Sequence, residues 1–119
     1  MVRGRCHCGA VRYVFRPEPE AATSCNCSYC RRAGALWIYA TCDEVELSYG
    51  PEAVVRYVHG DRRLAFVSCA TCGCTTHWEP VAGAPDARMA VNLRMADPAA
   101  AEGLRIRRFD GAESWRYVD

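Results

Sequence analysis

Two short cysteine motifs decide how this chain folds: Cys-His-Cys at residues 6–8 and Cys-Ala-Thr-Cys-Gly at residues 69–73. Tetrahedral zinc holds each thiolate sulfur at about 2.3 Å, so its sulfur ligands lie within ~4 Å of one another. In an extended Cys-x-Cys segment both side chains share one face and can converge. In Cys-x-x-Cys a tight turn brings both sulfurs to one point, and the glycine that follows permits a positive φ. Both spacings are typical of zinc ligands.

Neither motif supplies four ligands by itself. Joining Cys6 and Cys8 to Cys69 and Cys72 completes a Cys₄ zinc site. This site would tie the first segment of the chain to a strand far along the sequence. Because the free energy of metal binding appears as folding free energy, the tie is expected to add several kcal/mol to the stability of a small domain.

A third cysteine group has a different composition. Cys25, Cys27 and Cys30 place three thiols within six residues. Three protein ligands with one open position are the arrangement expected of a catalytic zinc. The alternative is that a fourth protein ligand closes this site as well, and the candidates are Cys42, Cys74, His59 and His77.

The neighbours of these candidates favour simpler roles for several of them. Cys42 ends an alternating apolar run over residues 36–42, which favours packing as a small hydrophobic side chain. Cys74 is interpreted as a spare thiol. Trp37 and Tyr39 share one face of the same run, and core packing is favoured over a pocket wall.

The composition indicates a folded domain in a reducing compartment. The 119 residues are 50% hydrophobic and 24% charged, which excludes disorder and predicts a single domain over residues 1–119. Nine cysteines in tight groups, an odd number, and no secretory signal argue against disulfides and favour metal ligands in the cytoplasm. No apolar run approaches the roughly 18 residues of a membrane span.

The charge balance gives no reason to expect a nucleic acid or a membrane as partner. The formal net charge is +1. Seven thiolates would add seven negative charges and two Zn²⁺ ions four positive charges, which leaves the metal-loaded chain near −2. All 15 basic residues are arginine, which excludes Schiff-base chemistry on a lysine.

Short β-branched and alternating runs between glycine and proline residues predict a mostly antiparallel all-β domain. Helix is limited to a turn that starts at Ser28 and a turn at Pro98–Glu102, with Asp97 as N-cap and Gly103 at its end. The predicted strands are Val11–Phe15, Leu36–Thr41, Val45–Tyr49, Val54–His59, Leu64–Cys69, Thr75–Glu79, Arg88–Leu93 and Ile106–Phe109.

The cysteine groups, in this order, resemble the glutathione-dependent formaldehyde-activating family, also called the CENP-V/GFA family. The matching stretches are residues 4–11, 25–32 and 69–73, with further similarity at 91–94 and 109–115. The resemblance implies a β-tent fold of short antiparallel sheets held by two zinc ions, with very little helix. It also implies that Cys6, Cys8, Cys69 and Cys72 bind a structural zinc, and that Cys25, Cys27 and Cys30 bind a catalytic zinc.

The resemblance further implies a carbon–sulfur lyase or synthase that joins glutathione and formaldehyde as S-hydroxymethylglutathione, a step of formaldehyde detoxification. Glutathione carries two carboxylates, so arginines are expected near the site, and Arg31 and Arg32 are the best placed. The chain is shorter than the glutathione-using members, so another low-molecular-weight thiol remains an alternative. A non-catalytic zinc-stabilised interaction module and, more weakly, a redox or iron–sulfur protein are the competing functions.

Overall fold

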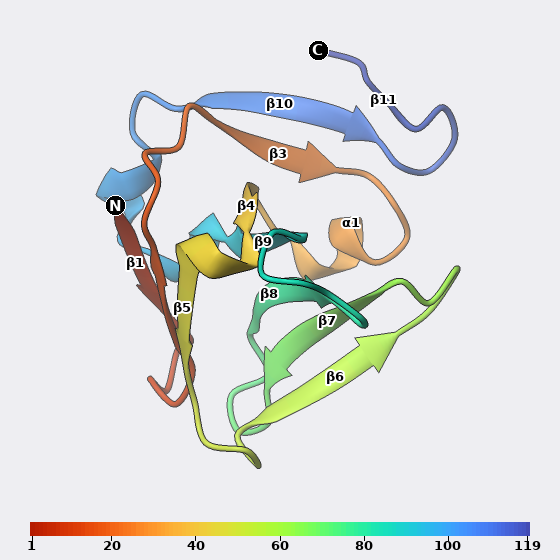
Figure 1. Cartoon of the computed structure of the whole chain (residues 1–119). Helices are drawn as coiled ribbons and strands as arrows, with labels where there is room; N and C mark the ends of the chain where they lie inside the picture. Colours follow the sequence, from red (N-terminus) through yellow and green to blue (C-terminus); the bar gives the residue numbers. More distant parts are fainter.

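The computed structural model describes residues 1–119 and contains eleven short strands in two sheets (Figure 1). The smaller sheet has three antiparallel strands in the order β1-β2-β5. Its register places Val2 opposite Phe15, and Phe15 opposite Val45, so three apolar side chains line one face. The strands are β1 (Val2–Arg5), β2 (Arg12–Phe15) and β5 (Val45–Ser48).

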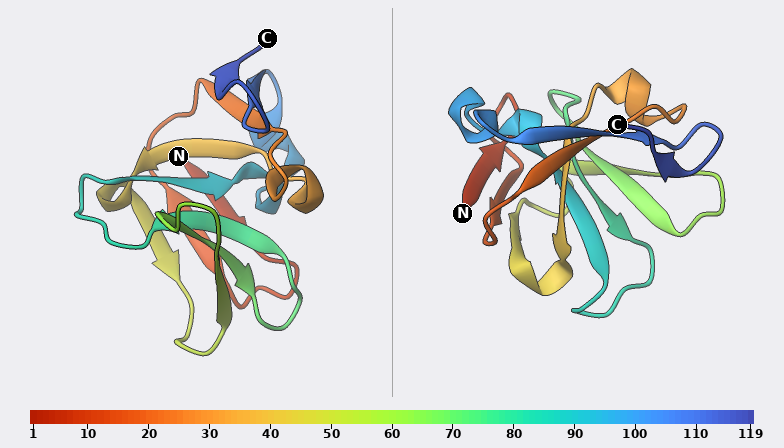
Figure 2. Two further views of the ribbon diagram at one scale, coloured as in Figure 1. Left: turned by 90° about the vertical axis from the view of Figure 1, so that its right-hand side faces the viewer. Right: turned by 90° about the horizontal axis from the view of Figure 1, so that it is seen from above.

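The larger sheet has eight strands in the order β11-β10-β3-β4-β9-β8-β7-β6. Every neighbouring pair is antiparallel except β3 and β10, which run parallel and lie side by side at the top of Figure 1. Figure 2 shows how strongly this sheet twists between its two ends. Its strands are β3 (Ala21–Cys25), β4 (Trp37–Thr41), β6 (Val54–Val58), β7 (Leu64–Cys69), β8 (Thr75–Pro80), β9 (Arg88–Asn92), β10 (Arg105–Asp110) and β11 (Arg116–Tyr117).

Helical structure is confined to four short segments, and none is long and apolar enough to cross a bilayer. The segment nearest the three-cysteine group ends at Gly34, whose φ of 65° is the left-handed conformation that favours glycine. The predicted cap at Asp97 is confirmed, because its carboxylate accepts the backbone N–H of Ala99 at 2.9 Å. The segments are α1 (Cys30–Ala33) and the 3₁₀ turns η1 (Cys42–Glu44), η2 (Leu93–Met95) and η3 (Pro98–Ala101).

The predicted all-β fold with very little helix is confirmed, and all eight predicted strands are present within one or two residues at each end. Three strands escaped the sequence analysis. β1 carries a glycine and two arginines, β3 is built from small residues, and β11 has only two residues. None of these segments has the β-branched or aromatic alternation on which strand prediction depends.

The main hydrophobic core lies between the small sheet and the centre of the large sheet. Phe15 of β2, Ile38 of β4 and Met89 of β9 are its largest fully buried side chains. A second cluster packs behind the three-cysteine group and contains Trp37 and Phe66. The main core therefore packs directly against β4 and β9, which support the three-cysteine group.

Gly4 is required because the buried ring of Tyr13 lies directly against it. A Cβ at residue 4 would lie 2.3 Å from the Tyr13 ring, and the Tyr13 hydroxyl is fixed by donating to the carbonyl of Asn92 at 2.9 Å. Gly4→Ala is therefore expected to lower the free energy of unfolding by about 2 kcal/mol or more. Urea denaturation measures this change. Gly50→Ala, where no atom lies within 4 Å of the added Cβ, is the matched control, and equal losses in both variants would contradict the prediction.

His77 on β8 is a fully buried histidine that the fold holds neutral. Its Nδ1 lies 2.9 Å from the Thr76 hydroxyl, while Nε2 has no hydrogen-bond partner. Burial, and then the positive charge of Arg56, lowers the pKa of His77 from 6.5 to about 4. Glu79 lies 3.8 Å from Nε2, but it is ion-paired with Arg56 and does not offset the burial.

This pKa sets the sign of a pH dependence. His77 takes up its proton near pH 6.5 in the unfolded chain and only near pH 4 in the folded chain. The contribution of neutral, buried His77 to the free energy of unfolding is therefore complete above pH 6.5 and is lost as the pH falls toward 4. The loss reaches about 3 kcal/mol. Urea unfolding of the wild type and of His77→Gln between pH 4 and 7 isolates this contribution, because acid effects on the cysteines occur in both proteins. Parallel stability curves for the two proteins would rule it out.

Candidate metal centres

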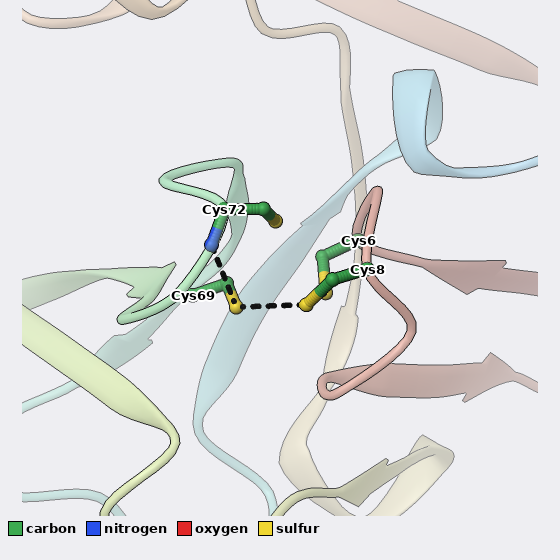
Figure 3. Close-up of side chains that lie close together, drawn as sticks. All are labelled: Cys6, Cys8, Cys69 and Cys72. Carbon is green, nitrogen blue, oxygen red and sulfur yellow. Dashed lines mark hydrogen bonds between the residues drawn. The ribbon is translucent and has the colours of Figure 1, made fainter.

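The four cysteines of the two deciding motifs converge on one point (Figure 3). Cys6 and Cys8 lie in the turn after β1, Cys69 is the last residue of β7, and Cys72 lies in the turn that follows. The sulfur of Cys8 lies 3.7 Å from that of Cys6 and 3.5 Å from that of Cys69, and all four sulfurs lie within 4.8 Å of one another. These separations fit a tetrahedron of sulfurs at about 2.3 Å from a central zinc ion.

Backbone N–H groups point at these sulfurs. Val11 donates to Cys6 at 3.3 Å, and Thr71 and Cys72 donate to Cys69 at 3.4 and 3.5 Å. Gly73 has the positive φ expected for the residue after Cys-x-x-Cys, at 80°. The backbone N–H of Cys74 is the main cause that lowers the pKa of Cys72, to about 5. The turn therefore favours the thiolate, the form that binds metal.

The second set consists of Cys25, Cys27 and Cys30, here called the cysteine trio. Cys25 is the last residue of β3, Cys27 lies in the next turn, and Cys30 is the first residue of α1. Their sulfurs lie within 4.8 Å of one another. Each sulfur accepts one N–H: Cys25 from Cys27 at 3.5 Å, Cys27 from Cys30 at 3.3 Å, and Cys30 from the Trp37 indole at 3.3 Å.

The thiols of Cys25 and Cys30 differ strongly in acidity. A hydrogen bond from the Cys30 thiol lowers the pKa of Cys25 to about 6, and the same contact, with burial, raises the pKa of Cys30. Cys25 is therefore more readily ionised than Cys30, and a bound cation would displace the proton held on Cys30. The trio fits a zinc ion as three of its four ligands.

Four residues were candidates for a fourth ligand: Cys42, Cys74, His59 and His77. None of them places a ligand atom within 4.8 Å of all three sulfurs of the trio. Cys42 packs against the main core, as its apolar run predicted, and Cys74 packs in the cluster around Cys6 and Cys69. His59 stacks on Tyr29 with ring centroids 6.0 Å apart. His77 is buried on β8, with its ring 6.2 Å from that of Tyr49.

The trio lines a cavity of about 340 Å³. Eleven of its twelve lining residues are hydrophobic, and Arg88 of β9 is the exception. The Arg88 guanidinium lies 4.1 Å from the centre of the Tyr39 ring and forms no ion pair. Core packing was favoured for Trp37 and Tyr39. Trp37 is indeed fully buried, but both side chains also wall the cavity.

Arg31 and Arg32 lie on the exposed side of α1. Arg32 donates to the Ser28 carbonyl at 2.7 Å and borders a separate hollow that includes Tyr29 and His59. Neither arginine lines the cavity of the trio, where Arg88 is the available guanidinium. The sequence offered no signal for Arg88, because an isolated arginine at the start of a strand looks like a solvated charge.

A clamp that the sequence analysis missed holds the trio against the turn after β10. Asn26, between two cysteines of the trio, donates to the Asp110 carboxylate at 3.0 Å and accepts the N–H of Ala112 at 3.0 Å. Asp110 in turn accepts the backbone N–H and the hydroxyl of Ser114 at 3.1 and 2.8 Å. These bonds lower the pKa of Asp110 to about 2. The clamp depends on pairing between segments 84 positions apart, which no local motif reveals.

Gly111 follows Asp110 and makes the closest approach to the trio. A Cβ at residue 111 would lie 2.7 Å from the sulfur of Cys25 and 3.1 Å from the Cβ of Cys27. Gly111→Ala is therefore expected to displace Cys25 and to weaken metal binding at the trio by about 10-fold or more. Competition with a chromophoric chelator measures this affinity. Gly50→Ala is the control with open space around the new methyl group, and unchanged affinity in Gly111→Ala would contradict the geometry.

Comparisons with known proteins agree with this arrangement. The family model described as glutathione-dependent formaldehyde-activating enzyme matches residues 1–105. A Halomonas elongata protein named "Putative glutathione-dependent formaldehyde-activating enzyme" is 34% identical over 80 residues, which cover 66% of this chain and 47% of that protein. The chain thus aligns with about half the length of this curated relative.

A crystal structure of a Rhodobacter sphaeroides protein has the same fold, with a TM-score of 0.66 and 30% sequence identity. The match covers 87% of this chain and 98% of that one. Since the family model spans both cysteine sets and most of the sheet framework, the chain belongs to the glutathione-dependent formaldehyde-activating enzyme family.

Proposed function

We propose that this protein is a zinc-dependent carbon–sulfur lyase or synthase, which forms and cleaves the bond between a thiol and the carbonyl carbon of an aldehyde. The family description names glutathione and formaldehyde as the two substrates. One zinc ion is held by Cys6, Cys8, Cys69 and Cys72 as a structural tie. The other is held by the cysteine trio as the catalytic ion. A reducing cytoplasm would keep all seven thiols available.

One observation carries this proposal: the trio offers three sulfurs, includes no fourth ligand, and lines a cavity. A site that exchanges a ligand requires three protein ligands and open space for the fourth, and the trio offers both. A zinc ion bound there would favour the thiolate form of an entering thiol and stabilise negative charge on the carbonyl oxygen.

The chain's own residues would orient the reactants and keep water out. The N–H groups of Cys27, Cys30 and Trp37 orient the three sulfurs, and aromatic rings line the space beside them, which limits the access of water. Tyr39 and Tyr117 are the hydroxyl-bearing residues of the cavity, and burial raises the pKa of Tyr39 to about 12. The Tyr39 phenol therefore stays protonated at neutral pH and can donate a hydrogen bond to the developing oxyanion.

Exchange NMR tests the reaction against its appreciable uncatalysed background. Purified, reduced, zinc-loaded protein is mixed with ¹³C-formaldehyde and glutathione or another low-molecular-weight thiol, and the rate of interconversion with the adduct is measured. We expect acceleration of at least about tenfold over the protein-free rate with one or more thiols. Cys42→Ser, which belongs to neither cysteine set, should retain this activity.

A rate equal to the protein-free rate for every thiol would contradict the enzymatic proposal. If the protein then bound two metal ions and also captured a stoichiometric macromolecular partner, the non-catalytic interaction module would be the better description. Arg31 and Arg32 remain predicted carboxylate contacts for a thiol that reaches out of the cavity, and Arg32→Gln in the same assay tests that role through KM for glutathione.

A further inference from the structure

The cavity beside the trio is larger and more apolar than formaldehyde requires. Its volume is about 340 Å³, whereas a single water molecule occupies about 30 Å³ in the liquid and a dry cavity of about 150 Å³ holds a benzene ring. Formaldehyde has two heavy atoms and would leave most of this space to water. Water gains few hydrogen bonds against aromatic walls, so an apolar group of the substrate is the better occupant.

One wall of the cavity comes from the C-terminal hairpin of β10 and β11, which contributes Phe109, Trp115 and Tyr117. The Phe109 ring meets Trp115 and Tyr117 edge-to-face, each with centroids 5.1 Å apart. The hairpin thus places three aromatic rings on one wall of the cavity.

Trp115 has two properties that folding alone does not favour. Its side chain is 71% exposed, and its φ of 58° lies in the left-handed region, which is strained for a bulky residue. The turn after Asp110 holds Trp115 in place, because the backbone N–H of Trp115 donates to the backbone carbonyl of Asp110 at 2.7 Å. A strained backbone that presents an indole at a cavity rim is typical of a ligand-contacting position.

The polar lining sets a second limit on the substrate. Arg88 is the single basic residue of the cavity and has no carboxylate partner. It can therefore meet one carboxylate, next to an otherwise aromatic surface. Glutathione, with two carboxylates and two peptide groups, matches this lining poorly.

We propose, on the basis of the function proposed above, that this site takes thiol–aldehyde adducts bearing an aromatic or similarly bulky apolar group, with Trp115 as a specificity-determining residue. In the synthetic direction the sulfur bonds to the carbonyl carbon, and the proton of the thiol ends on the former carbonyl oxygen. Cleavage reverses both changes, so no oxidant or reductant is needed.

Two substrate pairs distinguish which half of the adduct carries the apolar group. Benzyl mercaptan with formaldehyde places it on the thiol, and 2-mercaptoethanol with phenylacetaldehyde places it on the aldehyde. The reference is 2-mercaptoethanol with formaldehyde. We expect kcat/KM, corrected for the uncatalysed rate, to be at least tenfold higher for one aromatic pair than for the reference. Trp115→Ala should lower that ratio at least fivefold, whereas Val118→Ala, exposed but outside the cavity, should not.

A binding measurement makes the inference independent of turnover. Phenylacetate should bind the zinc-loaded protein saturably and at least tenfold more tightly than acetate, which shares its carboxylate but lacks the ring. Trp115→Ala should weaken the binding of phenylacetate and leave that of acetate unchanged. If phenylacetate binds no better than acetate, the inference is wrong even where formaldehyde is turned over. If no pair is accelerated but phenylacetate still binds preferentially, the proposed reaction fails and the aromatic site stands.

Discussion

Cys69→Ser is expected to remove one metal ion and most of the stability of the domain. The Cys₄ set joins the turn after β1 to the end of β7 across 61 positions, so its metal closes a long loop that the small sheet cannot close by itself. Structural zinc contributes folding free energy of about 10 kcal/mol or more, comparable with the total stability of a domain this size. We therefore expect the melting temperature to fall by about 15 °C or more.

Metal analysis and calorimetry check this result together. Cys74→Ser is the matched control, because Cys74 packs in the same cluster and belongs to neither ligand set. The control should keep two metal ions per chain and its melting temperature within a few degrees. A Cys69→Ser protein that retained two metal ions and full stability would show that this set is not a structural metal site.

Cys27→Ser is expected to remove the other metal ion and the activity, with little effect on the fold. The trio closes a loop of only six residues, so its metal restricts the unfolded chain far less than the Cys₄ set does. The apolar cluster behind the trio also contains Trp37, Phe66, Ala35 and Ala90, whose packing does not depend on the metal. Adduct exchange should fall to the uncatalysed rate, while the metal content falls from two ions to one.

The melting temperature separates this outcome from simple unfolding. It should change much less in Cys27→Ser than in Cys69→Ser, although each variant removes one sulfur. Cys42→Ser supplies the reference for a cysteine packed against the core. An equal fall in the melting temperatures of Cys27→Ser and Cys69→Ser would indicate that the trio is a second structural metal site and not a reactive centre.

The sequence predicted both cysteine sets because ligand spacing is a local property. Cys-x-Cys on an extended segment and Cys-x-x-Cys-Gly in a turn each limit where their sulfurs can lie. The positive φ of Gly73 followed from the same reasoning. The strands with β-branched or aromatic alternation were equally visible, whereas β1 and β3 were not, since their positions depend on partners elsewhere in the sheet.

The cavity could not be predicted, because its walls come from segments that only the folded topology brings together. Trp78 and Arg88 lie on neighbouring strands of the sheet, and Phe109 and Trp115 arrive with the C-terminal hairpin. The parallel pairing of β10 with β3 places Phe109 opposite Cys25, and a two-residue β11 then returns Tyr117 to the same wall. No periodicity within either segment encodes that contact.

The coordination of the metal at the trio is the central claim, and X-ray absorption on the metal-loaded protein tests it most directly. With both sets filled and no added thiol, the account predicts an average of three and a half sulfur ligands per metal ion, since one set offers four and the other three. Saturation with a substrate thiol should raise the average to four. An average of four before any thiol is added, or no change on its addition, would contradict the open position on which the proposed chemistry rests.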